Sequence, residues 1–479
     1  MRQLDGGQGN VVLRSYGQVR ILVSWFLAMK VELIMKWYPR LLLVVLLITP
    51  FQLRDVVRAE NAVVRFSTHD HGDPGDRAPV VTAWKRVKLD PDYGGLWVVT
   101  GDVDGDGEVD IVSCENVNRN DVHYTSTAVA QRLDGSVIWR WGDPSIGRKQ
   151  WSHDVACQIY DWDGDGQNEV ILCTQGMLVE LDGRSGKERR RLPIARDATD
   201  CLVFANLTGK DRATDVLVKN RYHQIWAYDQ LGKPLWTVRD PGGFRTAHQP
   251  RPIDLDRDGR DEIMAGYAML NADGSLRWTF QSNAVDLRRG HLDCMRVLRS
   301  GNTPSDFRLI LTCCGANNIA CVGGDGHLYW EQSGHHFESV QIGRLFPDVA
   351  GKQVLVDIDH RPHGKSPLQV FDNDGRLRGQ IMGDYCRHHE FLDWMGDGYD
   401  EILIAYARGV FDARGRRIAT FATGQPGYSI LLGDMTGDGV GDVTIVTESP
   451  PTVHIFKNSS GTRKQNANEL GCGVNFTLY

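Results

Sequence analysis

Apolar residues in this chain come in short runs that end at turns rich in Gly and Asp. Runs such as "EVILC" at 169–173 and "EIMAG" at 262–266 are typical. No segment after the N-terminus places apolar residues at the three- and four-residue intervals of an amphipathic helix. The pattern therefore predicts many short β-strands separated by tight turns.

An acidic turn precedes many of these strands. "GDVDGDGEVDIV" at 101–112 resembles "YDWDGDGQNEVIL" at 160–172, and further copies lie at 253–266, 392–405 and 433–446. In these five copies the first and last acids are eight positions apart. Weaker copies lie at 204–218, 296–314 and 342–358. Eight copies thus begin near 102, 161, 206, 254, 298, 344, 394 and 434, a spacing of roughly 40 to 60 residues.

A second motif follows within most units. "AQRLDGSVIWRW", "AYDQLGKPLWTV" and "VGGDGHLYWEQ" each consist of a strand, a tight turn containing Gly and a second strand, which is the signature of a hairpin. Each unit then holds about four strands, which is typical of a propeller blade. We predict an all-β protein in which 60–479 form a single propeller of eight four-stranded antiparallel blades. A count of seven fits if one weak copy is an insertion.

Residues 1–59 are predicted to be targeting sequence outside the fold. "MKWYPRLLLVVLLITPF" begins at Met35 with a basic start and continues into an apolar run, and "VVRAEN" offers small residues for cleavage. This predicts a mis-assigned start and a signal peptide over about 35–59. The protein would then be secreted or periplasmic, with a retained membrane anchor as the alternative.

Composition narrows the partners. The 479 residues include 24% charged and 41% hydrophobic residues, with a net charge of −7. Lys and Arg are scattered, so a nucleic-acid partner is not expected. The ten cysteines have no regular spacing and mostly lie in apolar runs, which favours buried free thiols. We expect a monomer without stable membrane insertion.

The acidic turns are candidate calcium sites. Asp-x-Asp-x-Asp-Gly places carboxylates at alternate positions, and a hard cation binds such oxygens. The alternative is that the acids only cap turns by hydrogen bonding. The predicted ligands are Asp102, Asp104, Asp106, Asp110, Asp161, Asp163, Asp165, Glu169, Asp254, Asp256, Asp258, Glu262, Asp393, Asp397, Glu401, Asp434, Asp438 and Asp442.

Histidines gather just before these turns. When the units are aligned, seven of the 15 histidines fall in this one position: His153, His248, His291, His335, His336, His388 and His389. The strand that follows is the innermost of a blade, so these side chains are predicted to meet at the mouth of the central channel. They could bind a transition metal or exchange protons. The alternative is a polar plug without chemistry.

Further polar residues are predicted at the same mouth. His123, Asn220, Arg221 and Tyr222 follow strands in equivalent places, and Lys149, Trp151 and Arg245 lie nearby in the sequence. Cations attract a carboxylate, and aromatic rings stack on sugars. Together they indicate a site for an acidic sugar.

Three segments give a resemblance: "GDPSIGRKQWSHDVACQIYDWDGDG", "KNRYHQIWAYD" and the C-terminal "VHIFKN" with "GCGVNFTLY". They resemble secreted propeller polysaccharide lyases, namely ulvan lyases and related rhamnose–uronate lyases, with rhamnogalacturonan lyases more distant. The resemblance covers roughly 80–479 and implies cleavage of an acidic polysaccharide by β-elimination. It also implies seven blades, in conflict with the eight units counted.

The resemblance further implies roles for individual residues. His123 and His153 match paired histidines, Tyr222 matches a catalytic tyrosine, and Arg245 or Arg221 would hold the carboxylate. His248 is a further catalytic candidate, and Lys149, Trp151 and Asn220 are candidates for substrate binding. The resemblance also implies a structural zinc, for which the predicted ligands are His291, His335, Cys386 and His388.

Two other protein classes compete with the lyase prediction. A non-catalytic propeller that binds glycan or protein would keep the calcium turns without the ring of His, Tyr and Arg. A quinoprotein dehydrogenase would repeat tryptophan in every blade. Gly379 and Ala419 stand at that position in two units, which argues against it.

Overall fold

The predicted short strands form throughout the part of the chain that the structure describes. In this computed structural model these are residues 63–68, 78–120, 122–147, 157–358 and 367–461, all within the compact unit Val63–Tyr479. The described residues contain no α-helix; short 3-10 turns lie at Pro144–Ile146, Pro241–Gly243, Leu287–Arg289 and Pro304–Asp306.

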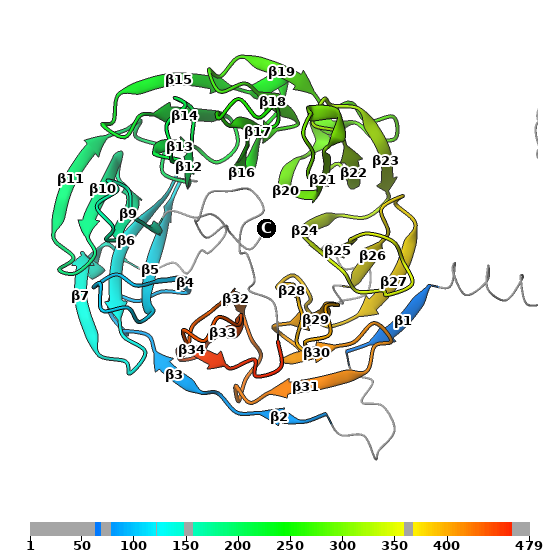
Figure 1. The fold of residues 1–479 in the computed structure, drawn as a ribbon. Helices are drawn as coiled ribbons and strands as arrows, with labels where there is room; N and C mark the ends of the chain where they lie inside the picture. The colour runs from blue at the N-terminus through cyan, green and yellow to red at the C-terminus, as the bar shows by residue number, and fades with distance from the viewer. Residues whose placement is uncertain (1–62, 69–77, 121, 148–156, 359–366, 462–479) are drawn as a thin grey trace, which may run out of the picture. The chain divides into compact units, whose positions relative to one another are not determined.

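Eight antiparallel sheets surround a central axis, with the first strand of each sheet innermost (Figure 1). We number them as blades 1 to 8 in chain order. Blades 1 to 4 consist of β4 (Trp97–Gly101), β5 (Asp110–Arg119), β6 (Val122–Gln131) and β7 (Val137–Gly142); β8 (Cys157–Tyr160), β9 (Glu169–Thr174), β10 (Met177–Asp182) and β11 (Glu188–Pro193); β12 (Cys201–Ala205), β13 (Asp215–Lys219), β14 (Gln224–Tyr228) and β15 (Pro234–Arg239); and β16 (Thr246–Ile253), β17 (Glu262–Gly266), β18 (Ala268–Leu270) and β19 (Leu276–Thr279).

The second half of the ring repeats this order. Blades 5 to 8 consist of β20 (His291–Arg299), β21 (Arg308–Cys314), β22 (Asn318–Val322) and β23 (Leu328–Ser333); β24 (Phe337–Gly343), β25 (Gln353–Ile358), β26 (Leu368–Phe371) and β27 (Leu377–Met382); β28 (His389–Leu392), β29 (Glu401–Ile404), β30 (Gly409–Phe411) and β31 (Arg417–Phe421); and β32 (Ser429–Gly433), β33 (Asp442–Glu448) and β34 (Pro451–Phe456).

The N-terminal segment closes the ring. Its strand β3 (Lys85–Lys88) pairs antiparallel with β34 and supplies the fourth strand of blade 8. The two strands before it, β1 (Val64–Ser67) and β2 (Val80–Val81), pair in parallel with the outer strands β27 and β31. One segment therefore supplies an outer strand to three consecutive blades, and its strands run from the right (β1) along the bottom (β2) to the lower left (β3) of Figure 1.

The core is divided among the interfaces between blades. Eight clusters of buried apolar side chains occur, and each is built from two neighbouring sheets. The cluster around Val87, Val98 and Ile455, for example, joins blade 8 to blade 1. Each blade thus buries both of its faces against its two neighbours, which explains the continuous apolar runs in its central strands.

Tryptophans on outer strands fasten one blade to the next. Trp139, Trp236, Trp278 and Trp330 each donate their indole Nε1–H to a main-chain carbonyl of the following blade, at distances of 2.6, 2.9, 2.7 and 2.9 Å. The ring of Trp330 lies so close to Gly375, where φ is 76°, that a Cβ there would come within 2.5 Å of it.

Blade 6 lacks this tryptophan, because Gly379 occupies the outer strand at that position. The adjacent N-terminal strand β1 supplies an aromatic ring instead. Phe66 packs against the turn of blade 7, where a Cβ on Gly415, at φ 80°, would come within 2.2 Å of the ring. Phe66 also stacks on Phe411, with ring centroids 5.8 Å apart.

The structure confirms eight blades, and the lower number implied by the resemblance is wrong for this chain. Every predicted repeat start falls in or just after the innermost strand of a blade. The nine described cysteines are buried and free, as predicted. Among the described residues, no helix is long and apolar enough to cross a bilayer. The predicted signal peptide at 35–59 lies outside the described residues.

Candidate functional site

The histidine position and the acidic turns lie at opposite ends of the innermost strands. On β16, His248 lies near the start of the strand and Asp254 directly follows its end. Six residues of extended chain separate them, a distance of about 20 Å. Because the innermost strands of all blades run in the same direction, one rim carries the histidines and the other rim carries the acids. We call these the histidine rim and the acidic rim.

The side chain of Tyr222 lies among two cations and two imidazoles. The guanidinium carbons of Arg221 and Arg245 are 5.1 and 5.7 Å from its ring centroid. The rings of His248 and His291 are centred 5.7 and 4.7 Å from it. Tyr222 is half-buried and Arg245 is exposed. Blades 3, 4 and 5 thus bring together on the histidine rim residues that are up to 70 positions apart in the sequence.

A buried ion pair next to the turn that carries Tyr222 holds this turn in place. Lys219 and Asp200 are 0% and 1% exposed, and their Nζ and Oδ2 atoms are 2.7 Å apart. Lys219 also donates to the carbonyl of Arg221 at 3.1 Å. Burial alone would raise the pKa of Asp200, but Lys219, His123 and Arg221 together hold it well below the usual value. Asp200 therefore stays ionised and keeps this turn in place.

Asn220, a predicted substrate-binding residue, has a clear local role in the same turn. Its Oδ1 accepts from the main-chain N–H groups of His223 and Gln224 at 3.0 and 2.8 Å. Its Nδ2 donates to Asp197 at 3.0 Å. The side chain holds the turn that presents Tyr222.

His123 is buried beside this turn. Its Nδ1 lies 2.6 Å from Asp200 Oδ1, and its Nε2 lies 2.8 Å from Asn118 Nδ2. Both ring nitrogens are therefore engaged by protein groups. This arrangement suits a residue that positions Arg221, whose Nη1 is 3.4 Å from the ring, better than one that contacts substrate.

The two imidazoles beside Tyr222 share one acid. Asp293 Oδ1 is 2.9 Å from His291 Nε2 and 3.4 Å from His248 Nε2. Burial, followed by the positive charge of His291, Arg221 and Lys219, holds the pKa of His248 well below its usual value. His248 is therefore neutral at neutral pH, and its burial and the neighbouring cations oppose its protonation.

A second buried cluster adjoins this one. One ligand atom from each of Asp293, Cys314, His336 and Glu338 lies within 4.8 Å of the others, and all four residues are buried. Cys314 Sγ is 2.8 Å from His336 Nε2, which is 2.9 Å from Glu338 Oε1. Such a mixture of sulfur, imidazole and carboxylate fits the ligands that zinc takes.

The zinc set predicted from the sequence is not brought together in the described residues. His291 lies beside Tyr222, and His335 is exposed, with its ring against Phe337 at 5.9 Å. His388 packs against Tyr385 and Tyr428. Cys386 is buried in the apolar cluster between blades 6 and 7. Alignment of the blades correctly placed these residues at one rim. The rim is circular, however, so only side chains from neighbouring blades can come into contact, and these four do not converge.

Three acidic turns each bring together three of their four predicted carboxylates, and Asp106, Asp165 and Asp258 are not part of these groups. The converging groups, each within 4.8 Å, are Asp102, Asp104 and Asp110; Asp161, Asp163 and Glu169; and Asp254, Asp256 and Glu262. Burial raises the pKa of Asp110 to about 6 and those of Glu169 and Glu262 to about 7. In the turns at Asp393 and Asp434, Met395 and Thr436 replace the middle acid, and no such group forms there among the described residues.

Each of the three converging turns also holds an arginine, which the sequence did not indicate. Arg189 Nη1 lies 3.1 Å from Asp163 and 2.8 Å from Glu169. Arg277 Nη1 lies 2.9 Å from Asp256 and 2.8 Å from Glu262. Arg132 contacts Asp104. A metal ion in these turns would compete with a guanidinium for the same oxygens.

The remaining predicted residues, His153, Lys149 and Trp151, lie outside the described residues. Conversely, sequence reasoning missed Lys219, Asp293, Cys314 and Glu338. Asp293 and Glu338 follow His291 and His336 by two positions, so they share a face of an extended strand. This spacing of two residues between a histidine and an acid could have identified Asp293 and Glu338 from the sequence.

Comparison with known proteins shows likeness at the level of structure. No family model and no curated protein matches the chain. A rhamnogalacturonan lyase PL11 from Bacillus licheniformis matches with a TM-score of 0.60 and 20% identity, over 79% of this chain and 76% of that one. The rhamnogalacturonan lyase YesW matches with a TM-score of 0.56 and 18% identity, over the same shares. The V. cholerae biofilm matrix protein Bap1 matches with a TM-score of 0.52 and 13% identity, over 84% and 93%. At these identities, the chain shares a fold with lyases and with a matrix protein alike.

Proposed function

We propose that this protein is a polysaccharide lyase that cleaves a uronic-acid-containing polysaccharide, ulvan-like or rhamnogalacturonan-like, by β-elimination. One observation carries the proposal: Tyr222 lies among Arg221, Arg245, His248 and His291 on the histidine rim. The similarity to two structures named as rhamnogalacturonan lyases supports this class of substrate.

The reaction makes three demands on a site. A base takes the proton from C5 of the uronate, and the electron pair forms the C4–C5 double bond. The C4–O bond breaks, and the leaving glycosidic oxygen takes up a proton. Because the C5 proton is a weak acid, a cation must offset the charge of the adjacent carboxylate as negative charge develops.

Residues of this chain meet these demands as follows. Arg245 is exposed, and its guanidinium faces the Tyr222 ring, so it holds the carboxylate. Tyr222 moves the protons, and the neutral imidazole of His248 lies beside its ring. Arg221 is bound to Asp200 and His123 and keeps the turn in position. His153 stays a predicted partner in proton transfer, and Lys149 and Trp151 stay predicted contacts to the sugar.

The decisive experiment measures unsaturated uronate by its ultraviolet absorbance, with ulvan, rhamnogalacturonan and polygalacturonate as substrates. We expect the parent to cleave at least one of them. Tyr222→Phe should reduce turnover by about a hundredfold to ten-thousandfold, the usual cost of losing a positioned acid or base, with an unchanged melting temperature. Tyr228→Phe, whose hydroxyl binds the main chain of Ala195, is a matched control on the next strand.

Two results would contradict the assignment. Cleavage by Tyr222→Phe at the parental rate would remove Tyr222 from the mechanism. If the parent makes no unsaturated uronate from any uronate polymer, the protein is a propeller that binds glycan or protein without cutting it. We also propose that the protein is secreted or periplasmic, as the signal peptide predicted over about 35–59 implies.

We also propose two kinds of metal site. Calcium would bind the three converging acidic turns, and one zinc would bind among Asp293, Cys314, His336 and Glu338. Zinc there would hold blades 5 and 6 together beneath His291. Arg387, 2.7 Å from Glu338 Oε2, partly neutralises the same carboxylate.

The zinc proposal is tested by metal analysis of protein purified without chelator. We expect about one zinc per chain in the parent and loss of it in Cys314→Ser, because thiolate is the strongest zinc ligand of the set. Cys386→Ser should keep the metal. If Cys386→Ser loses zinc and Cys314→Ser keeps it, the ligand set predicted from the sequence is favoured. If the parent contains no zinc, both ligand sets are wrong.

A further inference from the structure

A cavity of about 640 Å³ opens between blades 5 and 6, far from Tyr222. It lies on the acidic rim, at the ends of strands opposite to the histidines. Strand β20 connects the two places, because it begins at His291 and ends at Arg299. Eight residues of extended chain make that separation about 26 Å. One sugar ring cannot occupy both places.

Cations dominate the lining of this cavity. Arg299, Arg308 and Lys352 contribute positive charge, and the one lining carboxylate, Asp374, pairs with Arg376 at 2.9 Å. Arg308 donates from Nη1 to the carbonyls of Ser305 and Phe307 at 2.8 and 2.7 Å.

The two lining guanidinium groups bind main-chain carbonyls, and the exposed carboxylate of Asp306 is close enough to interact with the charge of Arg299. Arg299 donates from Nε to the carbonyl of Asp306 at 3.1 Å. Within the described residues, neither Arg299 nor Arg308 forms an ion pair with a carboxylate. The cavity therefore presents positive charge that an anion is able to satisfy.

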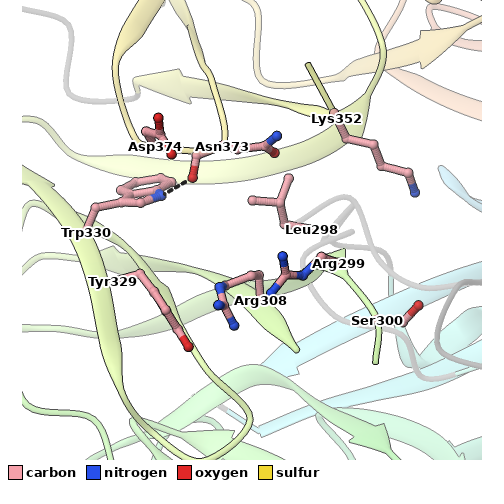
Figure 2. Close-up of a pocket in the computed structure, with 10 residues that line it drawn as sticks. Leu298, Arg299, Ser300, Arg308, Tyr329, Trp330, Lys352, Asn373 and Asp374 are labelled. Atoms are coloured by element: carbon pink, nitrogen blue, oxygen red, sulfur yellow. Dashed lines mark hydrogen bonds between the residues drawn. The ribbon is translucent and has the colours of Figure 1, made fainter. Parts of the chain in front are cut away.

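Aromatic rings form one wall. Figure 2 shows Tyr329 and Trp330 on one side of the cavity and Lys352 on the other, with Arg299 and Arg308 between them. Arg308 stacks on Tyr329, with 3.3 Å between its guanidinium carbon and the ring centroid. Trp330 is anchored by its 2.9 Å hydrogen bond to the carbonyl of Asn373, drawn dashed in Figure 2. Tyr329 is 40% exposed, so part of this aromatic wall faces the solvent.

We propose that this cavity is a second, non-catalytic binding site for an anionic saccharide. Flat aromatic rings stack on sugar rings, and guanidinium groups bind carboxylate or sulfate through charge-assisted hydrogen bonds. The wall is held by stacking and hydrogen bonds before any ligand arrives, so little ordering opposes binding. Such a site would hold a polymer on the face opposite to Tyr222 and raise the residence time of the protein on it.

The test uses the full chain with Tyr222→Phe and Arg245→Ala as background, so that cleavage and the first site do not contribute. Calorimetric titration with a galacturonate trisaccharide should show one site per chain. Adding Arg299→Gln and Lys352→Gln should weaken binding on the order of tenfold or more, the loss expected for about 1.4 kcal/mol. Arg414→Gln, an exposed arginine in the turn between β30 and β31 of blade 7, removes one positive charge outside the cavity and should leave the affinity unchanged.

Further saccharides distinguish the source of the anion. A sulfated trisaccharide that binds while galacturonate does not would assign the site to sulfate esters, which is the same anionic class. A neutral trisaccharide should not bind. Equal binding of the neutral sugar, unchanged affinity in the Arg299→Gln and Lys352→Gln protein, or an equal loss in Arg414→Gln would overturn the proposal. The readout is binding alone, so a failed lyase assay leaves this test intact.

Discussion

At the scale of single residues, some side chains of the site hold its structure in place, whereas others are exposed and can contact a substrate. Lys219 and His123 are buried and both bind the buried carboxylate of Asp200, so these three side chains hold the turn that carries Tyr222. Replacing one partner of a buried pair leaves the other charge uncompensated, which is strongly destabilising. Arg245 lies on the surface of this group, and its contact is the ring of Tyr222.

This difference predicts opposite outcomes for the two arginines. Arg245→Ala should lower kcat/KM on a uronate polymer by about a hundredfold to a thousandfold, the usual cost of losing one stabilising charge partner in a transition state. Its melting temperature should stay at the parental value. Arg221→Ala should lower the melting temperature, because it deprives Asp200 of a cation 3.7 Å away.

Steady-state kinetics and thermal melts on both variants decide the point. An Arg245→Ala protein with parental kcat/KM, beside an Arg221→Ala protein that is stable but inactive, would assign the carboxylate to Arg221.

At the scale of elements, each innermost strand connects two rims with different tasks. Its start carries a side chain of the candidate site, and its end leads into an acidic turn. In three turns, buried carboxylates whose pKa values are raised to about 6 or 7 lie beside an arginine. A divalent cation would replace the proton and offset the mutual repulsion of the acids more fully than one guanidinium does.

We therefore expect calcium to stabilise the propeller. A ligand that binds only the folded chain adds about 2.7 kcal/mol per site at a hundred times its Kd. Chelator should lower the melting temperature, and added calcium should restore it. Glu169→Gln should reduce the response, whereas Glu108→Gln, an exposed acid with no part in a converging group, should not.

Two calorimetric scans, with chelator and with calcium, are sufficient. Identical melts together with a calcium-free parent would show that Arg132, Arg189 and Arg277 alone neutralise the turns.

At the scale of the whole molecule, stability depends on closing the ring. Each interface between blades holds one apolar cluster, so an open ring would expose two sheet faces. The last blade is completed by β3 from the N-terminal segment, and β1 of the same segment lends Phe66 to the contact between blades 6 and 7. The N-terminal segment is thus part of three interfaces at once.

Phe66→Ala should consequently destabilise the fold by about 1–3 kcal/mol, less than the 3–5 of a fully buried Phe because this ring is half-buried. Val80→Ala on the neighbouring strand β2 is the control: Val80 is 68% exposed, and surface changes cost about 0.5 kcal/mol or less. Urea unfolding measures both. Equal midpoints for the two variants would mean that Phe66 does not support the closure.

The sequence by itself determined the repeating part of this protein. The repeat length, the residues of the turns and the strand pattern are local properties of the sequence. Each blade repeats them, so eight copies supported the same prediction of a propeller. Alignment on the acidic turns then placed His248 and Arg245 at one rim, because the innermost strands of a propeller all point the same way, and the position of Tyr222 just after a strand placed it at the same rim. The convergence of Asp161, Asp163 and Glu169 was equally local, since all three lie within one turn.

Only the tertiary structure decided which residues of that rim meet. A ring brings neighbouring blades together and keeps distant ones apart, so His291 joined Tyr222, while Cys386 and His388 lie elsewhere. Contacts made by long side chains across blades, such as that of Arg212 in blade 3 with Asp161 in blade 2, join residues 51 positions apart and cannot be read from a local pattern. The same holds for Phe66, which replaces a tryptophan from more than 300 positions away, because chain closure is a property of the whole ring.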